Sequence, residues 1–200
     1  RWLVSDVRTW YPVAGQPQRH LGAALAAAVR QDGRTAAAEV RKAAAYVRLE
    51  AARATGDARQ ALARADAELA QTARALDKDA VKSDQALQQV LARAGHALAL
   101  AHHERAAQAF AHKEYEQAGY ELKAAAQSLQ GAAQWGSAQT RAAAQSADAS
   151  ARTVGDKLAG GGVWARDEVA AALEGLGHAL DRLGQDVGAA PKPASPRKPT

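Results

Sequence analysis

Four of the six histidines fall between residues 96 and 112, and this stretch is the first place to look for chemistry. One helix grips a metal ion best through two histidines four residues apart. His96 and His103 share a helical face but are separated by about 10 Å along the axis, and His102 points about 100° away from His103. The spacing therefore predicts that this helix alone does not form a metal site.

A second helix would have to complete any metal site. The oxygen donors that could do so are Tyr46, Glu50, Glu116 and Glu121. We expect His96, His102 and His103 to be structural, with no metal or cofactor bound, and keep a weak metal site on these three residues as an alternative. His102 falls on a leucine stripe, where an imidazole must stay neutral or find a polar partner. Tyr46 or Tyr120 could supply that partner.

Other catalytic patterns are missing from the sequence. Gly160-Gly-Gly162 connects two predicted helices, which indicates a hinge rather than a phosphate-binding loop. The carboxylates are scattered without the Glu-x-x-His pair of di-iron bundles, and no serine sits in a strand-turn-helix elbow. The absence of cysteine excludes thiolate nucleophiles, disulfides and sulfur-ligated metals. We therefore expect a protein that is not an enzyme.

The composition predicts an all-α protein. Alanine, the best helix former, supplies 56 of the 200 residues, and Cys, Met, Asn and Ile do not occur. An excess of Ala and Arg without Ile and Asn is also what a GC-rich coding sequence produces. We expect a bacterial protein on this composition.

Residues 18–135 are predicted to form an antiparallel, Ala-rich helical bundle. The expected helices span residues 18–30, 35–55, 57–76, 83–112 and 115–135, and their short connections force sequential helices to run antiparallel. Thr35 and Ser83 are the expected N-caps of the second and fourth helices, and Gly33 is expected to end the first helix in the left-handed conformation. Arg64 and Glu68 are expected to form a supporting i,i+4 pair.

Residues 136–190 are predicted to form a helical appendage with a hinge at Gly160–Gly162. Its two helices span residues 138–158 and 164–187, and the second has apolar residues at an unbroken 4-3-4-3-4 spacing. We call this set the apolar stripe of the last helix: Val169, Leu173, Leu176, Leu180, Leu183 and Val187. It is predicted to dock on the bundle, or to bind a protein partner or a second copy of the chain. Gly177 and Gly184 lie beside it and suit close approach by another helix.

The last helix resembles, in pattern, the exchangeable amphipathic helices of apolipoproteins and the Ala-rich phasins of polyester granules. This resemblance implies a lipid-surface or granule-surface protein, which we keep as an alternative. Helices that settle on anionic membranes carry Lys and Arg on their polar face. The polar face here has five acidic residues against Arg166 and Arg182, so we do not expect binding to anionic membranes.

A second, shorter resemblance concerns residues 83–135. The pair of helices, with Glu114-Tyr-Glu-Gln-Ala-Gly-Tyr120 after the first, Ala-rich helix, resembles a tetratricopeptide hairpin over about 40 residues, but no second copy follows at the 34-residue period of that repeat. The sequence therefore does not predict a solenoid.

The two ends of the chain differ from the rest. Residues 1–17 contain Trp2, Trp10 and Tyr11, and we expect them to cover the bundle end as a lid or to belong to a preceding region. Residues 191–200 form a basic, Pro-rich tail that is predicted to be disordered. Three cations in this tail give too few phosphate contacts for strong nucleic-acid binding.

Function and location follow only as general expectations. The chain starts at Arg1 without an initiator Met, so we expect a processed form or a fragment, and a periplasmic or cell-envelope location with the cytoplasm as the alternative. No apolar run reaches the length of a membrane span. The favoured function is that of a non-enzymatic helical-bundle scaffold or binding protein.

Overall fold

The computed structural model describes residues 15–78, residue 80 and residues 83–189. This part of the chain is all-α, as predicted, with seven helices and no strand: α1 Gly15–Val29, α2 Gly33–Arg53, α3 Gly56–Leu76, α4 Asp84–Ala111, α5 Tyr115–Ala133, α6 Ala138–Ala159 and α7 Arg166–Asp186. The predicted lid of residues 1–17 falls mostly outside the described residues, and the predicted disordered tail lies entirely outside them.

The connection between α1 and α2 differs in detail from its prediction. Asp32, not Thr35, caps α2, and its carboxylate accepts the N–H of Thr35 at 3.0 Å. The left-handed residue is Gln31, with φ of 60°, rather than Gly33. The reason is that α1 ends in paired turn hydrogen bonds, from Asp32 N to Ala27 O and from Gln31 N to Ala28 O, which require that conformation at Gln31.

The turn between α4 and α5 uses the same device. Lys113 has φ of 64°, and the next residue, Glu114, donates its N–H to Ala109 O at 2.9 Å. At the other end of α4 the prediction is confirmed, since the Ser83 side chain accepts the N–H of Ala86 at 3.1 Å. Both ends of this long helix are therefore fixed by local hydrogen bonds.

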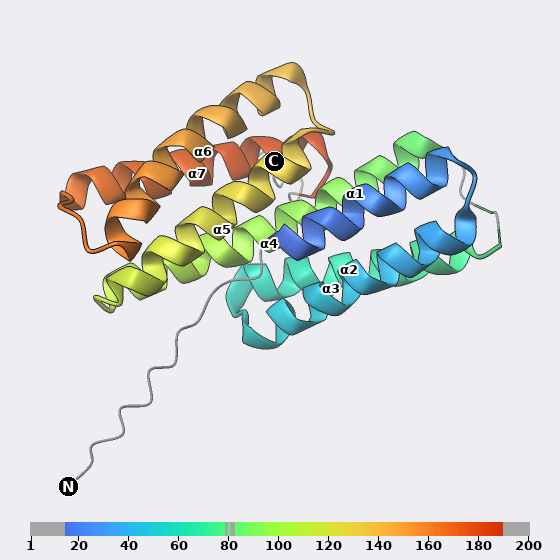
Figure 1. The fold of residues 1–200 in the computed structure, drawn as a ribbon, viewed down its shortest axis with the longest axis horizontal. Helices are drawn as coiled ribbons and strands as arrows, with labels where there is room; N and C mark the ends of the chain where they lie inside the picture. Colours follow the sequence, from blue (N-terminus) through green and yellow to red (C-terminus); the bar gives the residue numbers. More distant parts are fainter. Residues whose placement is uncertain (1–14, 79, 81–82, 190–200) are drawn as a thin grey trace, which may run out of the picture.

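Two hydrophobic clusters share α4, which runs through the middle of the molecule (Figure 1). One side of α4 packs with α1, α2 and α3 through residues such as Leu91 and Leu98. Its other side packs with α5, α6 and α7 through Ala92, Ala99 and Ala106. A helix that is apolar on two sides can be packed between two groups of helices, and α4 takes that place.

The predicted boundary at residue 136 lies between α5 and α6, and one hydrophobic cluster extends across it. Helix α5, which the prediction grouped with the first bundle, packs mainly on α4 and α6 and belongs to the same cluster as α7. The molecule therefore consists of two four-helix units, α1–α4 and α4–α7, with α4 common to both.

Glycine brings α5 and α6 into close contact. A Cβ atom built on Gly119 would lie 2.6 Å from the carbonyl oxygen of Gly155, far inside van der Waals contact. On α4, a Cβ atom at Gly95 would lie 2.7 Å from the Cβ of Ala132. Small residues at these crossings let the Ala-rich helices approach closely, because no large side chain separates them.

Candidate functional site

The three central histidines of α4 point to two different sides of the helix. His96 and His103 face α7, where their Nε2 atoms lie 3.1 Å from Leu180 O and 2.9 Å from Leu173 O. His102 faces the junction of α4 with α2 and α5. The predicted separation of the histidines is therefore confirmed, and the structure does not bring the three imidazoles together.

His96 and His103 connect α4 to the backbone of α7. Because a carbonyl oxygen can only accept, each imidazole donates its Nε2–H, which fixes the tautomer and removes Nε2 as a metal ligand. Burial lowers the pKa of His96, while its bond to Leu180 O and the nearby Asp181 act in the opposite direction. His96 is thus held in its neutral form within the interior.

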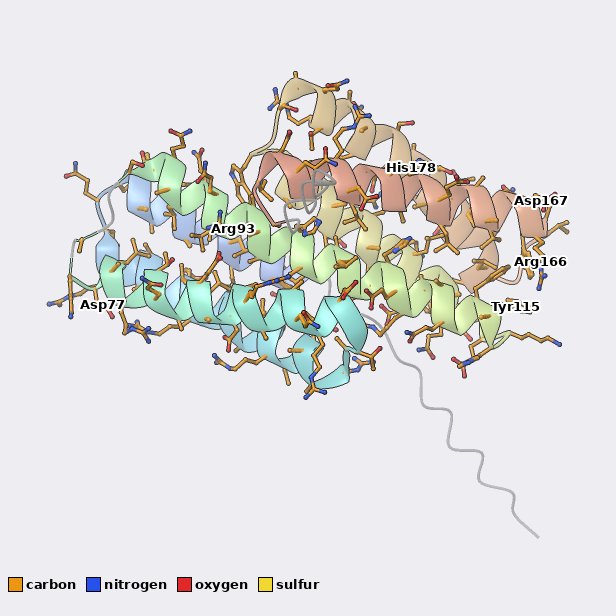
Figure 2. The ribbon with its side chains drawn as sticks, turned by 180° about the vertical axis from the view of Figure 1, so that it is seen from behind. Asp77, Arg93, Tyr115, Arg166, Asp167 and His178 are labelled. Atoms are coloured by element: carbon orange, nitrogen blue, oxygen red, sulfur yellow. The ribbon has the colours of Figure 1, made fainter. Side chains whose placement is uncertain are left out.

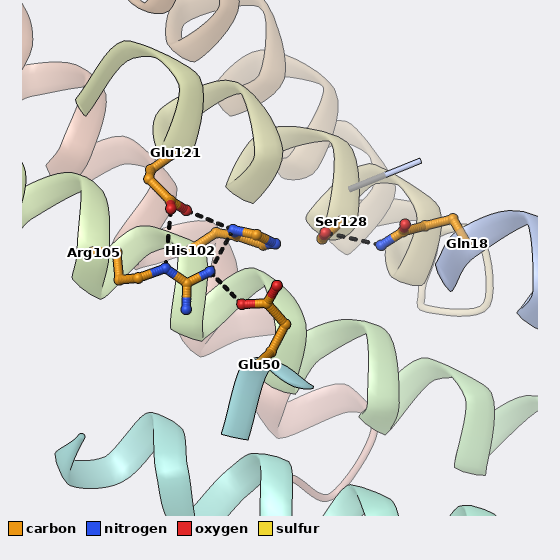
Figure 3. A network of polar contacts seen from close by, with 6 residues as sticks. All are labelled: Gln18, Glu50, His102, Arg105, Glu121 and Ser128. Carbon is orange, nitrogen blue, oxygen red and sulfur yellow. Dashed lines mark hydrogen bonds and ion pairs between the residues drawn. The ribbon is translucent and has the colours of Figure 1, made fainter. Parts of the chain in front are cut away.

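A cluster of four charged or titratable side chains lies at the junction of α2, α4 and α5, and we call it the junction quartet: Glu50, His102, Arg105 and Glu121 (Figure 3). His102 Nδ1 lies 2.7 Å from Glu121 Oε2, and Arg105 Nε donates to Glu121 Oε1 at 3.1 Å. Arg105 Nη2 lies 2.6 Å from Glu50 Oε2. The quartet therefore connects a helix of each four-helix unit to the shared helix.

The partners predicted for His102 were wrong. Tyr46 stacks on His20 with ring centroids 5.9 Å apart, and Tyr120 lies under the ammonium group of Lys123 at 5.2 Å. The actual partner, Glu121, was among the oxygen donors considered for a metal, but the structure uses it for a hydrogen bond within the protein. Arg105 was not anticipated, because nothing in its sequence surroundings indicates that its side chain is largely covered.

Charges around Glu121 offset its burial. Burial alone would raise the pKa of this carboxyl, but the bond from His102 and the charges of His102 and Arg105 hold the pKa below its usual value. Glu121 is therefore an ionised carboxylate, with 5% of its side chain exposed. A buried carboxylate next to an imidazole can hold or orient a proton, which is the chemistry that this cluster could perform.

The ion pairs of the quartet leave some polar atoms without a hydrogen bond. The contact of Arg105 Nη2 with Glu50 Oε2 is close but not aligned as a hydrogen bond, so this buried oxygen is unsatisfied among the described residues. Arg105 Nη1, which does not take part in that contact, is also buried without a hydrogen bond to a described residue. Two turns along α5 from Glu121, the buried Ser128 accepts a hydrogen bond from Gln18 Nε2 at 2.8 Å. Figure 3 shows this second pair on the far side of His102 from the arginine.

The described residues include no group of three or more His, Asp or Glu side chains placed to hold a metal ion. The same part of the chain has no helix with the length and apolar character of a bilayer span.

The apolar stripe of the last helix, α7, faces the interior of the second four-helix unit. Five of its six residues are buried, and Leu173 is half-buried against the same cluster. Of the two arrangements predicted for this helix, docked or offered to a partner, the structure has the docked one. Gly177 lies next to His103 on α4, in keeping with the predicted close approach.

An open groove lies between α3 and α4, and the sequence did not indicate it. A hollow of about 410 Å³ is lined mainly by Thr72, Ala75, Ala86, Leu87 and Val90. A hollow of about 190 Å³ adjoins it, since both are bordered by Glu68 and Arg93. Figure 2 shows Arg93 on α4, where this helix passes α3 and the end of α7. We call the two hollows together the α3–α4 groove.

The charged residues of the groove do not form the predicted ion pair between Arg64 and Glu68. Glu68 binds Arg93 Nε on the neighbouring helix at 2.7 Å, and Arg93 also donates to Val187 O at 3.3 Å. Arg64 lines the smaller hollow, is exposed, and forms no ion pair with any described residue. The predicted pair was wrong because the carboxylate meets a better-placed cation from α4.

Comparisons with protein-family models, with curated proteins and with solved structures find no match to this chain. The class of protein is therefore defined by its own fold and site. It is an all-α protein of two four-helix units with a shared central helix, a buried ionic cluster at their junction and an open groove on one side.

Proposed function

We propose that this protein is a non-enzymatic helical scaffold that binds its ligand in the α3–α4 groove. The observation that carries the proposal is the difference between the buried polar side chains, which bind one another, and the α3–α4 groove, which is open. The side chains that could do chemistry are used in contacts between helices. The groove instead combines apolar walls with the guanidinium of Arg64, which forms no ion pair with any described residue.

The junction quartet supports a structural role rather than a catalytic one. His102 and Glu121 are 2% and 4% exposed, so a substrate could reach them only if the helices separated. Arg105 contacts carboxylates from two different helices, which is how a buried cation fixes the relative position of packed elements. His96 and His103 connect α4 to α7 in the same way.

The lipid-surface alternative receives less support from the last helix. Its apolar stripe packs against α4, α5 and α6, so binding to a lipid or granule surface through this stripe would require α7 to leave the bundle. The groove needs no such rearrangement.

A photo-crosslinking amino acid placed at Val90 tests the binding surface. On the scaffold proposal, irradiation in extract of the source cells gives defined adducts from this position, and the same amino acid at Ala38 on the exposed side of α2 does not. Equal or absent labelling at the two positions would contradict the groove as the binding surface.

Turnover assays test the non-enzymatic part separately. With ester, phosphate and glycoside substrates, the wild-type protein is expected to match the His102→Gln variant. A reaction that is catalysed by the wild type and lost in a His102→Gln protein that remains folded would make the quartet an active site instead.

A further inference from the structure

The α3–α4 groove has one charged end and one apolar end. Its smaller hollow is bordered by Arg64, Arg93 and Glu68, which together carry one net positive charge, since the Glu68 carboxylate neutralises one of the two guanidinium groups. The larger hollow shares Glu68 and Arg93 with the smaller one, and beyond them it is lined by Gln71 and Thr72 and by alanines, Leu87 and Val90. The distance along α3 from Arg64 to Ala75 is about 16 Å at 1.5 Å per residue.

We infer that the groove binds a single-chain amphiphile with a carboxylate head, that is, a medium-chain or long-chain fatty acid. The carboxylate meets Arg64, whose guanidinium has no acidic partner among the described residues. The alkyl chain lies along Ala75, Ala86 and Val90. This inference rests on the proposed function, because it names the ligand class of the same groove.

The groove walls favour an alkyl chain over a peptide. Every backbone N–H and C=O of an extended peptide needs a hydrogen-bond partner when it is buried. The walls here are helices, whose own backbone groups are already paired within α3 and α4, and the larger hollow is mostly apolar. An alkyl chain has no polar groups to satisfy, so it enters such a groove without that cost.

The size of the larger hollow also favours a small ligand over a docked helix. An α-helix with its side chains is about 10–12 Å across. The larger hollow measures about 410 Å³, at the low end of the range of about 300–1,000 Å³ that is typical of small-molecule sites. Its size therefore suits one narrow chain.

Calorimetric titration of the full-length protein with decanoate and with 1-decanol tests the inference. The two ligands share their alkyl chain and differ in the charge of the head. Decanoate is expected to bind with about one equivalent and at least about threefold more tightly than 1-decanol, because only the carboxylate pairs with Arg64. Lengthening the carboxylate from eight to ten carbons is expected to raise the affinity, since each buried methylene contributes.

Three variants locate the site. Arg64→Gln is expected to bring the affinity for decanoate close to that for 1-decanol. Ala86→Phe, a change at an exposed position of the groove wall, is expected to lower the affinity for both ligands at least about tenfold. Ala75→Phe on the facing helix is expected to have the same effect. Arg74→Gln removes the same charge from α3 away from the groove and is expected to leave both affinities unchanged.

Three other outcomes would contradict the fatty-acid inference or the proposed function. Absence of decanoate binding, or decanoate binding that none of the groove variants weakens, overturns the inference. If an acidic extended peptide binds and is blocked by Ala86→Phe while decanoate does not bind, the fatty-acid assignment fails but the groove remains the binding surface. If Val90 also gives no specific crosslinks, the proposed function fails as well.

Discussion

At the scale of single residues, His102 is contacted at one nitrogen by two groups with opposite requirements. Nδ1 lies 2.7 Å from a Glu121 oxygen and 2.8 Å from Nη2 of Arg105. A carboxylate only accepts and a guanidinium only donates, so Nδ1 serves one of them at a time. Arg105 Nη2 has a second anion within reach in Glu50, whereas the imidazole is the only donor to Glu121 Oε2 among the described residues. This environment therefore favours a hydrogen on Nδ1, which is donated to Glu121.

The quartet makes Arg105 the residue whose loss costs most. Arg105→Met leaves the half-buried Glu50 and the buried Glu121 without their shared cation, and breaking a buried ion network in this way destabilises a protein by about 3–5 kcal/mol. Urea unfolding measures the change. Arg59→Met, an exposed position on α3 without a described ion pair, is the control and is expected to stay within about 0.5 kcal/mol of the wild type. A similar, small effect of both variants would show that the quartet does not hold the helices together.

His96 gives the fold a predictable dependence on pH. Burial lowers its pKa in the folded protein below the value of about 6.5 in the unfolded chain. The unfolded state then binds the proton more readily, so the contribution of His96 to stability is complete above about pH 6.5 and is lost as the pH falls below that value. Unfolding free energies at pH 7.5 and pH 5.5 are expected to differ less in His96→Gln than in the wild type. The exposed His178→Gln is expected to keep the wild-type difference, and a loss of pH dependence there instead would contradict this assignment.

At the scale of helices, the apolar stripe of each helix could be predicted, but the polar contacts between different helices could not. The leucine spacing along α4 and α7 and the cap at Ser83 follow from local rules, because each depends on residues within one or two turns. The junction quartet joins Glu50 to residues more than 50 positions later, so no local pattern marks it. The Arg64–Glu68 prediction failed for the same reason, since Arg93 on another helix competes for the carboxylate.

The crossing of α5 and α6 depends on glycine at one point. A methyl group at Gly119 would lie 2.6 Å from Gly155 O, so Gly119→Ala forces the helices apart and is expected to cost about 1–3 kcal/mol. Gly175 lies in α7 with no atom within 4 Å of its built Cβ, so Gly175→Ala is expected to stabilise the protein by up to about 1 kcal/mol. Thermal unfolding of the two variants gives opposite shifts in Tm. A Gly119→Ala protein as stable as Gly175→Ala would show that the close crossing is absent in solution.

At the scale of the whole molecule, the sharing of α4 makes each four-helix unit depend on the other. Composition alone predicted the all-α class, and helical periodicity predicted all seven helices. The grouping of those helices could not be read in the same way, because α4 is apolar on both sides and its sequence does not say which neighbour each side meets. The change of character after residue 136 therefore suggested a domain boundary at a place where α5 and α6 are in close contact.

Cutting the chain at that boundary separates the two interpretations. A fragment of residues 1–135 retains α1 to α5 but loses α6 and α7, which exposes Leu122 and Leu129 of α5 and the alanines of α4 that pack beside them. If α5 belongs with α6 and α7, the fragment is expected to bind the dye ANS, to show less helix per residue than the full chain by circular dichroism, and to unfold at a lower urea concentration. The full chain is expected to unfold in one transition, because no helix can leave α4 without uncovering part of a common core. A fragment that unfolds as cooperatively and at the same urea concentration as the full chain, without binding ANS, would place the boundary at residue 136 after all and make α6 and α7 an independent appendage.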